Sequence, residues 1–280
     1  MSYKTIGVHV DRSPDAPARM AVAAHIALRE QAHLIGIAFT GAAPLVVPRN
    51  GFDQGMPPMR VPQDALRAEA EFALDDFERL ASGLGVTLLE RRCVEEEAGY
   101  GMSLQARYCD LVVLGQLNGV HAPPLLRTDF TEYVLLHCAR PVLVVPAGVQ
   151  AAAPLGRRIL IGWNGSHNAT RALTSAIALM RRADRVELVV FNPDLKPAVH
   201  GEEPGADIGL YLARHGVPVQ VSAVRAEGDT GSALMRYAER NGADLVVMGA
   251  YGHSRMRDIL LGGVTRKALV SARLPLWMAH

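Results

Sequence analysis

Short apolar runs alternate with amphipathic segments along the second half of the chain. The apolar runs have strand length and cover residues 158–163, 185–191, 217–224 and 244–249. Between them, residues 166–182, 206–216 and 231–242 carry apolar positions at helical spacing. The strands are apolar with little alternation, which is typical of a parallel sheet covered by helices on both faces. This pattern predicts an open, doubly wound α/β sheet.

The first half of the chain repeats the same pattern. "IGVHVDRSPDAPARMAVAAHIA" from Ile6 resembles "ILIGWNGSHNATRALTSAIALM" from Ile159 at an offset of 153, and "DLVVLG" from Asp110 matches "DLVVMG" from Asp244 at an offset of 134. The difference of 153 − 134 = 19 residues is assigned to residues 41–62, whose prolines and glycines predict an irregular loop. We therefore predict two α/β units.

The boundary between these units is expected near "PAGVQAAAPLGRR", where prolines, glycines and alanines interrupt the pattern. The predicted domains are residues 1–148 and residues 155–280. The helix of the second domain that follows its first strand is expected to begin after Ser166 as its N-cap.

Composition narrows the class of protein and its partners. The 280 residues are 49% hydrophobic and 20% charged, with a net charge of +1. They contain no signal-peptide pattern and no apolar run near the roughly 18 residues of a membrane span. We expect a cytoplasmic protein that binds small molecules or proteins, and neither nucleic acid nor membranes. Cys93, Cys109 and Cys138 form no close pair, which predicts reduced thiols rather than disulfides or a zinc site.

Glycines follow the last apolar run of the second unit at regular places. Gly249 ends the predicted strand, Gly252 follows it, and Gly262 and Gly263 precede a predicted helix from Val264. A glycine lets the backbone approach a ligand, and a helix start offers unpaired N–H groups. The spacing suits a phosphate chain, but a loop that only reverses the chain explains it equally well.

These segments together resemble the universal stress protein family. The resemblance rests on "ILIGWNGS", on "DLVVMGAYGHS" and on G-x2-G-x9-G from Gly249 through Gly252 to Gly262, and it covers nearly the whole chain as two fused copies. It implies a flavodoxin-like or Rossmann-like fold of the adenine nucleotide alpha hydrolase-like type, with five parallel strands per unit. It also implies that the last strands, "VLVV" and "LWM", join antiparallel in an intramolecular pseudo-dimer. Alternatively, Trp277 and Met278 are ordinary core residues.

The resemblance further implies a ligand, because many members of the family bind ATP. ATP or AMP, which Mg²⁺ can accompany, is then expected in the second unit as a regulatory ligand. The expected binding residues are Asn164, Gly249, Gly252, His253, Gly262, Gly263, Val264 and Thr265.

The second unit departs from the family pattern at two places. Asn164 stands where nucleotide-binding members usually have Asp, so contacts to the adenosine would be uncharged. Gly263 stands where they usually have Ser or Thr, so Thr265 is the remaining hydroxyl for a terminal phosphate.

The first unit departs from the pattern further. It keeps Asp11, but Thr128 and Asp129 replace the glycines that would open the helix, and Pro123 and Pro124 remove amides. We do not expect the first unit to bind ATP.

Other chemistry finds little support in the sequence. His9, His25 and His33 are interpreted as ordinary core or surface histidines, and Glu95–Glu97 as a solvated charge run. Nucleophile-elbow, zincin and P-loop motifs are absent, so we expect no enzyme and at most slow ATP hydrolysis. The alternative function is an interaction module that binds no nucleotide and engages a protein or an apolar ligand through its inter-unit cleft or the 41–62 loop. Assembly into a homodimer stays open.

Overall fold

A computed structural model gives the fold of the chain. It describes residues 2–41, 45–46, 59–60, 62–116, 129–149, 155–195, 201–251 and 264–280. The elements of the first unit are β1 (Thr5–His9), α1 (Ala16–Glu30), β2 (His33–Phe39), β3 (Leu45–Val46), β4 (Met59–Arg60), α2 (Gln63–Gly83), β5 (Leu89–Val94), α3 (Ala98–Gln105), η1 (Ala106–Tyr108), β6 (Leu111–Gly115), α4 (Phe130–His137) and β7 (Val142–Val145).

The second unit repeats the main elements of the first in the same order. They are β8 (Arg158–Trp163), α5 (His167–Met180), β9 (Arg185–Phe191), η2 (Pro193–Leu195), α7 (Ala206–Arg214), β10 (Val219–Val224), α8 (Thr230–Arg240), β11 (Leu245–Gly249), α10 (Val264–Ser271) and β12 (Leu276–Ala279). Ser166 caps α5 as expected, because its hydroxyl accepts a hydrogen bond from the Ala169 amide at 3.1 Å. The apolar pattern therefore predicted these elements correctly.

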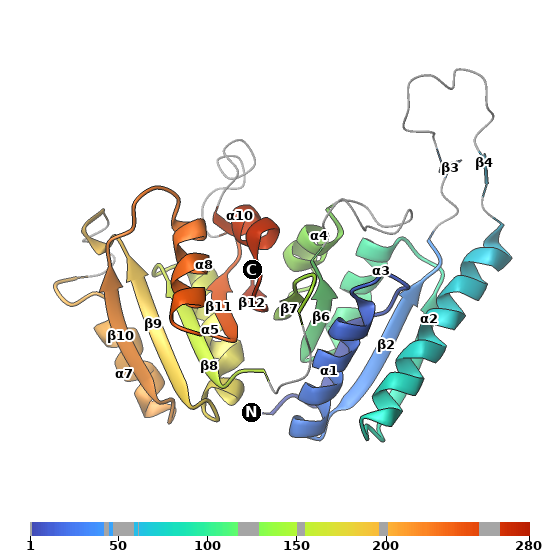
Figure 1. Cartoon of the computed structure of the whole chain (residues 1–280), viewed down its shortest axis with the longest axis horizontal. Helices are drawn as coiled ribbons and strands as arrows, with labels where there is room; N and C mark the ends of the chain where they lie inside the picture. The colour runs from blue at the N-terminus through green and yellow to red at the C-terminus, as the bar shows by residue number, and fades with distance from the viewer. Residues whose placement is uncertain are drawn as a thin grey trace, which may run out of the picture.

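All the main strands belong to one sheet of ten strands. Its order is β10-β9-β8-β11-β12-β7-β6-β1-β2-β5, so each unit contributes five strands that are parallel to one another. Figure 1 shows the two units side by side, with β12 and β7 at the centre. The predicted α/β class with two doubly wound parallel sheets is confirmed, and the two sheets are joined edge to edge.

The seam between the units is the antiparallel pair β12 and β7, in which Trp277 lies opposite Leu143. The Trp277 indole donates a hydrogen bond to the Ser175 hydroxyl at 2.9 Å, and the Tyr3 hydroxyl donates to the Ser175 carbonyl at 2.7 Å. Trp277 is fully buried. It is thus both a core residue and a member of the joining edge, and the intramolecular pseudo-dimer is confirmed.

Helices cover both faces of the sheet and form two cores. One core lies under α1, α2, α5 and α7, and the other lies under α3, α4, α8 and α10. Each core contains residues of both units, so apolar packing continues across the seam. Among the described residues, no helix has both the length and the apolar character needed to span a bilayer.

The prediction for residues 41–62 is wrong in one respect. Within this segment, β3 and β4 form a short antiparallel pair, with Leu45 opposite Arg60 and Val46 opposite Met59. Composition predicted a loop without any strand because prolines and glycines hide pairs of only two residues. The other residues between Gly41 and Pro62 lie outside the described part of the chain.

Candidate functional site

The strand order reverses between β1 and β6 in the first unit and between β8 and β11 in the second. Ligands of open α/β sheets bind at such a point, beyond the carboxyl ends of the strands. In the second unit, β8 and β11 are parallel neighbours, so the residues after Trp163 and the residues after Gly249 emerge at the same edge of the sheet (Figure 1). The candidate site of the second unit is therefore formed by these two strand ends and the first turn of α5.

Asn164 follows β8 and is exposed. Its side-chain oxygen accepts hydrogen bonds from the Ser166 amide at 3.1 Å and from the Ser166 hydroxyl at 2.7 Å. The carboxylate of Asp11 makes the same two bonds to Ser13 in the first unit. The side chain at this position thus shapes the turn before the helix in both units, and the amide nitrogen of Asn164 has no hydrogen-bond partner among the described residues.

Gly249 has a structural reason to be a glycine. A Cβ added at this position would lie 2.5 Å from the Ala169 amide nitrogen and 2.7 Å from the Asn168 carbonyl carbon. Both atoms belong to the backbone of α5, so the first turn of α5 can pack against β11 only if this residue has no side chain. The glycine that opens the predicted phosphate motif therefore also brings a helix start to the end of the strand.

The first amides after β11 are bonded within the protein. The Ala250 amide donates to the Ala279 carbonyl at 2.9 Å, and the Tyr251 amide donates to the Thr265 hydroxyl at 2.9 Å. The buried Asn168 side chain donates to the Ala250 carbonyl at 2.5 Å. These contacts hold the beginning of the loop against α5, α10 and the end of β12. Sequence reasoning missed Asn168 because its partner is 82 residues away.

The remaining predicted residues divide into described and undescribed ones. Val264 begins α10 and is 39% exposed, whereas Thr265 is 6% exposed and its hydroxyl faces the Tyr251 amide. The contact of Thr265 with a terminal phosphate stays a prediction. In this structure the hydroxyl accepts a hydrogen bond from the backbone that follows β11. Gly252, His253, Gly262 and Gly263 lie outside the described residues.

The corresponding space of the first unit contains a buried cation. Arg19 of α1 is 3% exposed, lies 2.9 Å from the Asp11 carboxylate, and donates through Nε to the His9 carbonyl at 2.7 Å. A Cβ on Gly115, which matches Gly249 at the offset of 134, would collide with the Arg19 guanidinium. Burial alone would raise the pKa of Asp11, but the charge of Arg19, helped by His9 and Ser13, holds this pKa well below its usual range.

His9 lies beside this ion pair and is 3% exposed. Its ring is 4.7 Å from the ring of Phe130 and 6.0 Å from the ring of Phe39, measured between centroids. Burial lowers the pKa of His9 to about 4, although the nearby carboxylate of Asp11 opposes this shift. At neutral pH the imidazole is uncharged and acts as part of the core.

Small residues replace these large ones in the second unit. The offsets of the repeat match His9 with Gly162, Arg19 with Ala172, and Phe130 with Val264. At these matched positions the second unit therefore has smaller side chains than the first, and Leu234 packs against Gly162. From the sequence, Asp129, Pro123 and Pro124 led to the expectation that the first unit binds no nucleotide. The buried Arg19 supports the same expectation. Its place in the alanine-rich segment "ARMAVAAHIA" is the sequence signal that could have identified it.

The other candidate groups have structural roles. Glu97 was interpreted as part of a solvated charge run, which is incomplete because it caps α3 by accepting hydrogen bonds from the amides of Gly99 and Tyr100. His33 lies 3.0 Å from Glu90, and no group of potential metal ligands occurs among the described residues. Cys109 and Cys138 are buried free thiols, and burial raises the pKa of each.

Comparisons with known proteins agree with this architecture. The model of the universal stress protein family matches residues 2–146 and again residues 156–280. A universal stress protein of Synechocystis sp. is 26% identical over 149 residues, which are 51% of this chain and 48% of that protein. A universal stress protein of Methanocaldococcus jannaschii is 25% identical over 138 residues, covering 43% of this chain and 80% of that protein. The match thus spans about half the length of the first relative.

Solved structures extend the likeness over the whole fold. A universal stress protein of Archaeoglobus fulgidus has a TM-score of 0.72 at 14% identity, with 98% of this chain and 95% of that chain covered. A protein of Pseudomonas aeruginosa UCBPP-PA14 gives a TM-score of 0.60 at 16% identity, covering 99% and 93% of the two chains. Because the family model matches both units and together these matches include most residues, the chain belongs to the universal stress protein family, as a tandem of two family units.

Proposed function

We propose that this chain is a stress-response protein whose second unit binds an adenine nucleotide, ATP or AMP, as a regulatory ligand without substantial turnover. The observation that carries the proposal is the difference between the strand ends of the two units. His9, Arg19 and Phe130 fill the first, and small residues stand at the matching positions of the second. The glycine spacing of the family motif also persists only in the second unit.

In this proposal Asn164 meets the adenosine through its amide nitrogen. Gly249 brings the first turn of α5 to the site, and amides near Gly252, Gly262 and Gly263 hold the phosphates, together with the start of α10 at Val264 and Thr265. His253 lies within the same motif, and Mg²⁺ can accompany the phosphates. No residue is proposed to catalyse hydrolysis. A cytoplasmic location stays a prediction from composition.

The test begins with protein purified under native conditions and then denatured for mass spectrometry, beside calorimetric titration with ATP and AMP. We expect co-purified nucleotide or a heat of binding, and loss of both in Gly252→Glu. Gly83→Glu is the matched control, because a Cβ at Gly83 meets nothing within 4 Å and the site lies in the other unit. Asn164→Asp restores the family's usual acid and should tighten binding. Protein that carries no nucleotide and gives no heat at millimolar ATP would exclude the proposal.

A second candidate function is an interaction module that binds no nucleotide. The observation that favours it is the internal bonding of the Ala250 and Tyr251 amides, which leaves these two donors unable to hold a phosphate. Such a module would engage a protein or an apolar ligand through the seam between the units or through residues 41–62. The same titration distinguishes the two functions, since this module gives no heat with ATP and its Gly252→Glu variant behaves as the wild type.

A further inference from the structure

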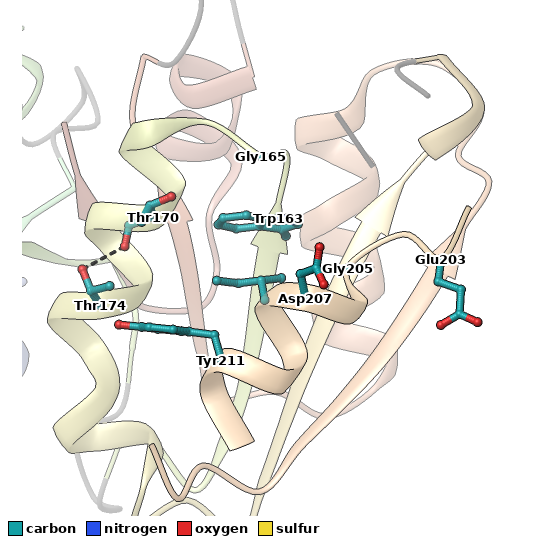
Figure 2. Close-up of a pocket in the computed structure, with 9 residues that line it drawn as sticks. Trp163, Gly165, Thr170, Thr174, Glu203, Gly205, Asp207 and Tyr211 are labelled. Carbon is teal, nitrogen blue, oxygen red and sulfur yellow. Dashed lines mark hydrogen bonds between the residues drawn. The ribbon is translucent and has the colours of Figure 1, made fainter. Parts of the chain in front are cut away.

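A groove lies between α5 and α7, on the face of the sheet that these helices cover in the second unit. It has a volume of about 440 Å³ and is lined by Trp163, Thr170, Thr174, Asp207, Ile208 and Tyr211, together with Gly165, Gly205 and Glu203. Figure 2 shows the Tyr211 hydroxyl directed toward Thr174, Asp207 beside Trp163, and the Glu203 carboxylate turned away from the others. The groove therefore combines two aromatic side chains with the carboxylate of Asp207, which is exposed.

The two threonines and the aspartate of this groove offer hydrogen-bond acceptors. The Thr170 hydroxyl donates its proton to the Ser166 carbonyl at 3.1 Å, and the Thr174 hydroxyl donates to the Thr170 carbonyl at 2.9 Å. Both hydroxyls thus present lone pairs to the groove. The carboxylate of Asp207 has no hydrogen bond or ion pair with any described residue. Tyr211 and Trp163 add the negative faces of their rings.

The matching surface of the first unit carries its own positively charged side chains. Its groove between α1 and α2 has a volume of about 430 Å³ and is lined by Asp11, Arg12, Asp76 and Arg79, among others. The Arg12 guanidinium lies 6.0 Å from the centroid of the Phe72 ring and 3.0 Å from Glu69 of α2, and Arg79 lies 2.7 Å from Asp76. The protein therefore supplies its own cations to the carboxylates and the aromatic ring of this surface.

The second unit has a glycine at the position of Arg12. Arg12 matches Gly165 at the offset of 153, and Gly165 has a φ of +71°, a conformation that an arginine rarely adopts. No lysine or arginine among the described residues lines the groove between α5 and α7. Within the described part of the chain, its acceptors and ring faces consequently have no counterpart of the positive group that the first unit provides. The dipole at the start of α7 opposes a cation by about half a charge, which the full charge of Asp207 exceeds.

We propose that the groove between α5 and α7 binds a small alkylammonium ion, such as a free diamine, from solution. The ammonium group lies between the Asp207 carboxylate and the Trp163 ring, the alkyl chain packs on Ile208, and the far end reaches the hydroxyls of Thr174 and Tyr211. A diamine satisfies both ends, because its second ammonium group donates to these hydroxyl oxygens. This groove adjoins the proposed nucleotide site, because Trp163 and Gly165 flank Asn164 and Thr170 lies in the first turn of α5. Amines and nucleotides are titrated separately, so either proposal can fail without the other.

The test titrates full-length, nucleotide-free protein with 1,4-diaminobutane, butylammonium and butan-1-ol at constant ionic strength. Calorimetry gives the affinity and tryptophan fluorescence locates the site, since Trp277 is fully buried and Trp163 lines the groove. We expect binding of both amines, with the diamine tighter, and no binding of the alcohol. Equal binding of the alcohol would show an apolar groove only and overturn the proposal. The proposal is also overturned if neither amine binds at 10 mM, taken as roughly the upper limit for a specific site.

Variants separate charge from bulk at this site. Asp207→Asn should weaken diamine binding about tenfold, because a charge-assisted hydrogen bond is lost. Thr174→Arg, an exposed helical position, places a guanidinium in the groove as the first unit does and should abolish binding, whereas Thr174→Gln adds bulk without charge and should keep most of it. Glu239→Gln removes a carboxylate from α8 on the opposite face and should change nothing. Unchanged affinity in Asp207→Asn, or tighter binding of N-acetyl-lysine methylamide than of the diamine, would overturn the assignment to a free amine.

Discussion

The two units build the same five parallel strands in the same order but complete the carboxyl ends of those strands differently. In the first unit, Arg19 and Asp11 form a buried ion pair beside the uncharged His9. In the second unit, Ala172 and Gly162 stand at the positions of Arg19 and His9. A duplicated fold can thus keep its scaffold in both copies while the side chains at the two switch points differ.

This comparison also changes the meaning of the motif glycine. Gly115 and Gly249 occupy the same place in the repeat, yet Gly115 makes room for a side chain of its own unit and Gly249 makes room for the backbone of α5. Packing therefore favours a glycine at this position in both units, whether or not a ligand binds, and most strongly at Gly249. The glycine alone does not distinguish a binding unit from a filled one, and the residues around it do.

The largest expected effect comes from removing the cation of the first unit. Arg19→Met leaves the Asp11 carboxylate, which is only 13% exposed, without its partner. Loss of one member of a buried pair costs about 3–5 kcal/mol of the free energy of unfolding. Asn164→Ala in the second unit removes only exposed hydrogen bonds and should cost below about 1 kcal/mol. Urea unfolding measures both.

A double variant is the control for this first prediction. Arg19→Met combined with Asp11→Asn removes both charges, so no buried charge stays unpaired and part of the lost stability should return. If the single Arg19→Met variant loses no more stability than Asn164→Ala, the ion pair does not organise the first unit and the comparison between the units fails.

The second prediction concerns pH and the same buried cluster. The pKa of His9 is about 4 in the folded protein and near 6.5 in an unfolded chain. Between these values the unfolded state binds a proton that the folded state does not, so the free energy of unfolding falls as the pH is lowered. The difference of 2.5 pKa units corresponds to roughly 3 kcal/mol. The second unit has Gly162 at this position and contributes no such change.

Unfolding in urea at pH 7, 6, 5 and 4.5 measures this dependence. His9→Asn should flatten the loss of stability between pH 6.5 and pH 4, whatever its effect at pH 7. His167→Asn, at an exposed position of α5, is the matched control and should keep the wild-type slope. An unchanged slope in His9→Asn would mean that the imidazole is already charged or solvated in the folded protein.

The sequence predicted the architecture well because the fold depends on local patterns. Apolar runs and helical spacing located the main strands and helices, and the repeated "DLVV" segments showed the duplication. The same aspartates also fix the strand starts, since Asp110 accepts hydrogen bonds from the amides of Lys4 and Thr5, and Asp244 from those of Gly156, Arg157 and Arg158. Such side-chain roles over 86 to 106 residues were not visible in the pattern.

The candidate site was predictable only in part, for the same reason. Asn164 was predicted because it follows a strand and Gly249 because it ends one, and both lie at the switch point. The contact of Asn168 with the Ala250 carbonyl and the position of Arg19 against Gly115 depend on how distant segments meet in three dimensions. The spacing of residues along the sequence does not reveal such contacts unless the two copies of the repeat are aligned with each other.

The third prediction uses the two motif glycines against each other. Gly249→Ala places a Cβ against the backbone of α5, which cannot move independently of the sheet, and should cost about 2–3 kcal/mol. Gly115→Ala meets the end of the flexible Arg19 side chain and should cost about 1 kcal/mol or less. Gly83→Ala, a helical position with nothing within 4 Å, is the control and should stabilise the protein slightly. Equal costs at Gly115 and Gly249, measured by urea unfolding, would contradict the different roles inferred for them.

The smallest effects are expected at the threonines that tie each strand end to the following helix. Thr131 donates a hydrogen bond to the Gly115 carbonyl at 2.9 Å, and Thr265 accepts one from the Tyr251 amide at 2.9 Å. Valine has the same shape without the hydroxyl, so Thr131→Val and Thr265→Val should each cost about 1 kcal/mol.

Added ATP then separates these two variants, because a ligand that binds only the folded state raises the unfolding temperature. Thr131→Val should keep the full ATP-dependent rise, since the first unit is not expected to bind. Thr265→Val should reduce it, both by loosening the loop after β11 and by removing the hydroxyl proposed to reach a phosphate. A full ATP-dependent rise in Thr265→Val would restrict this threonine to the structural role that it shares with Thr131, and would place the phosphate contacts on the backbone alone.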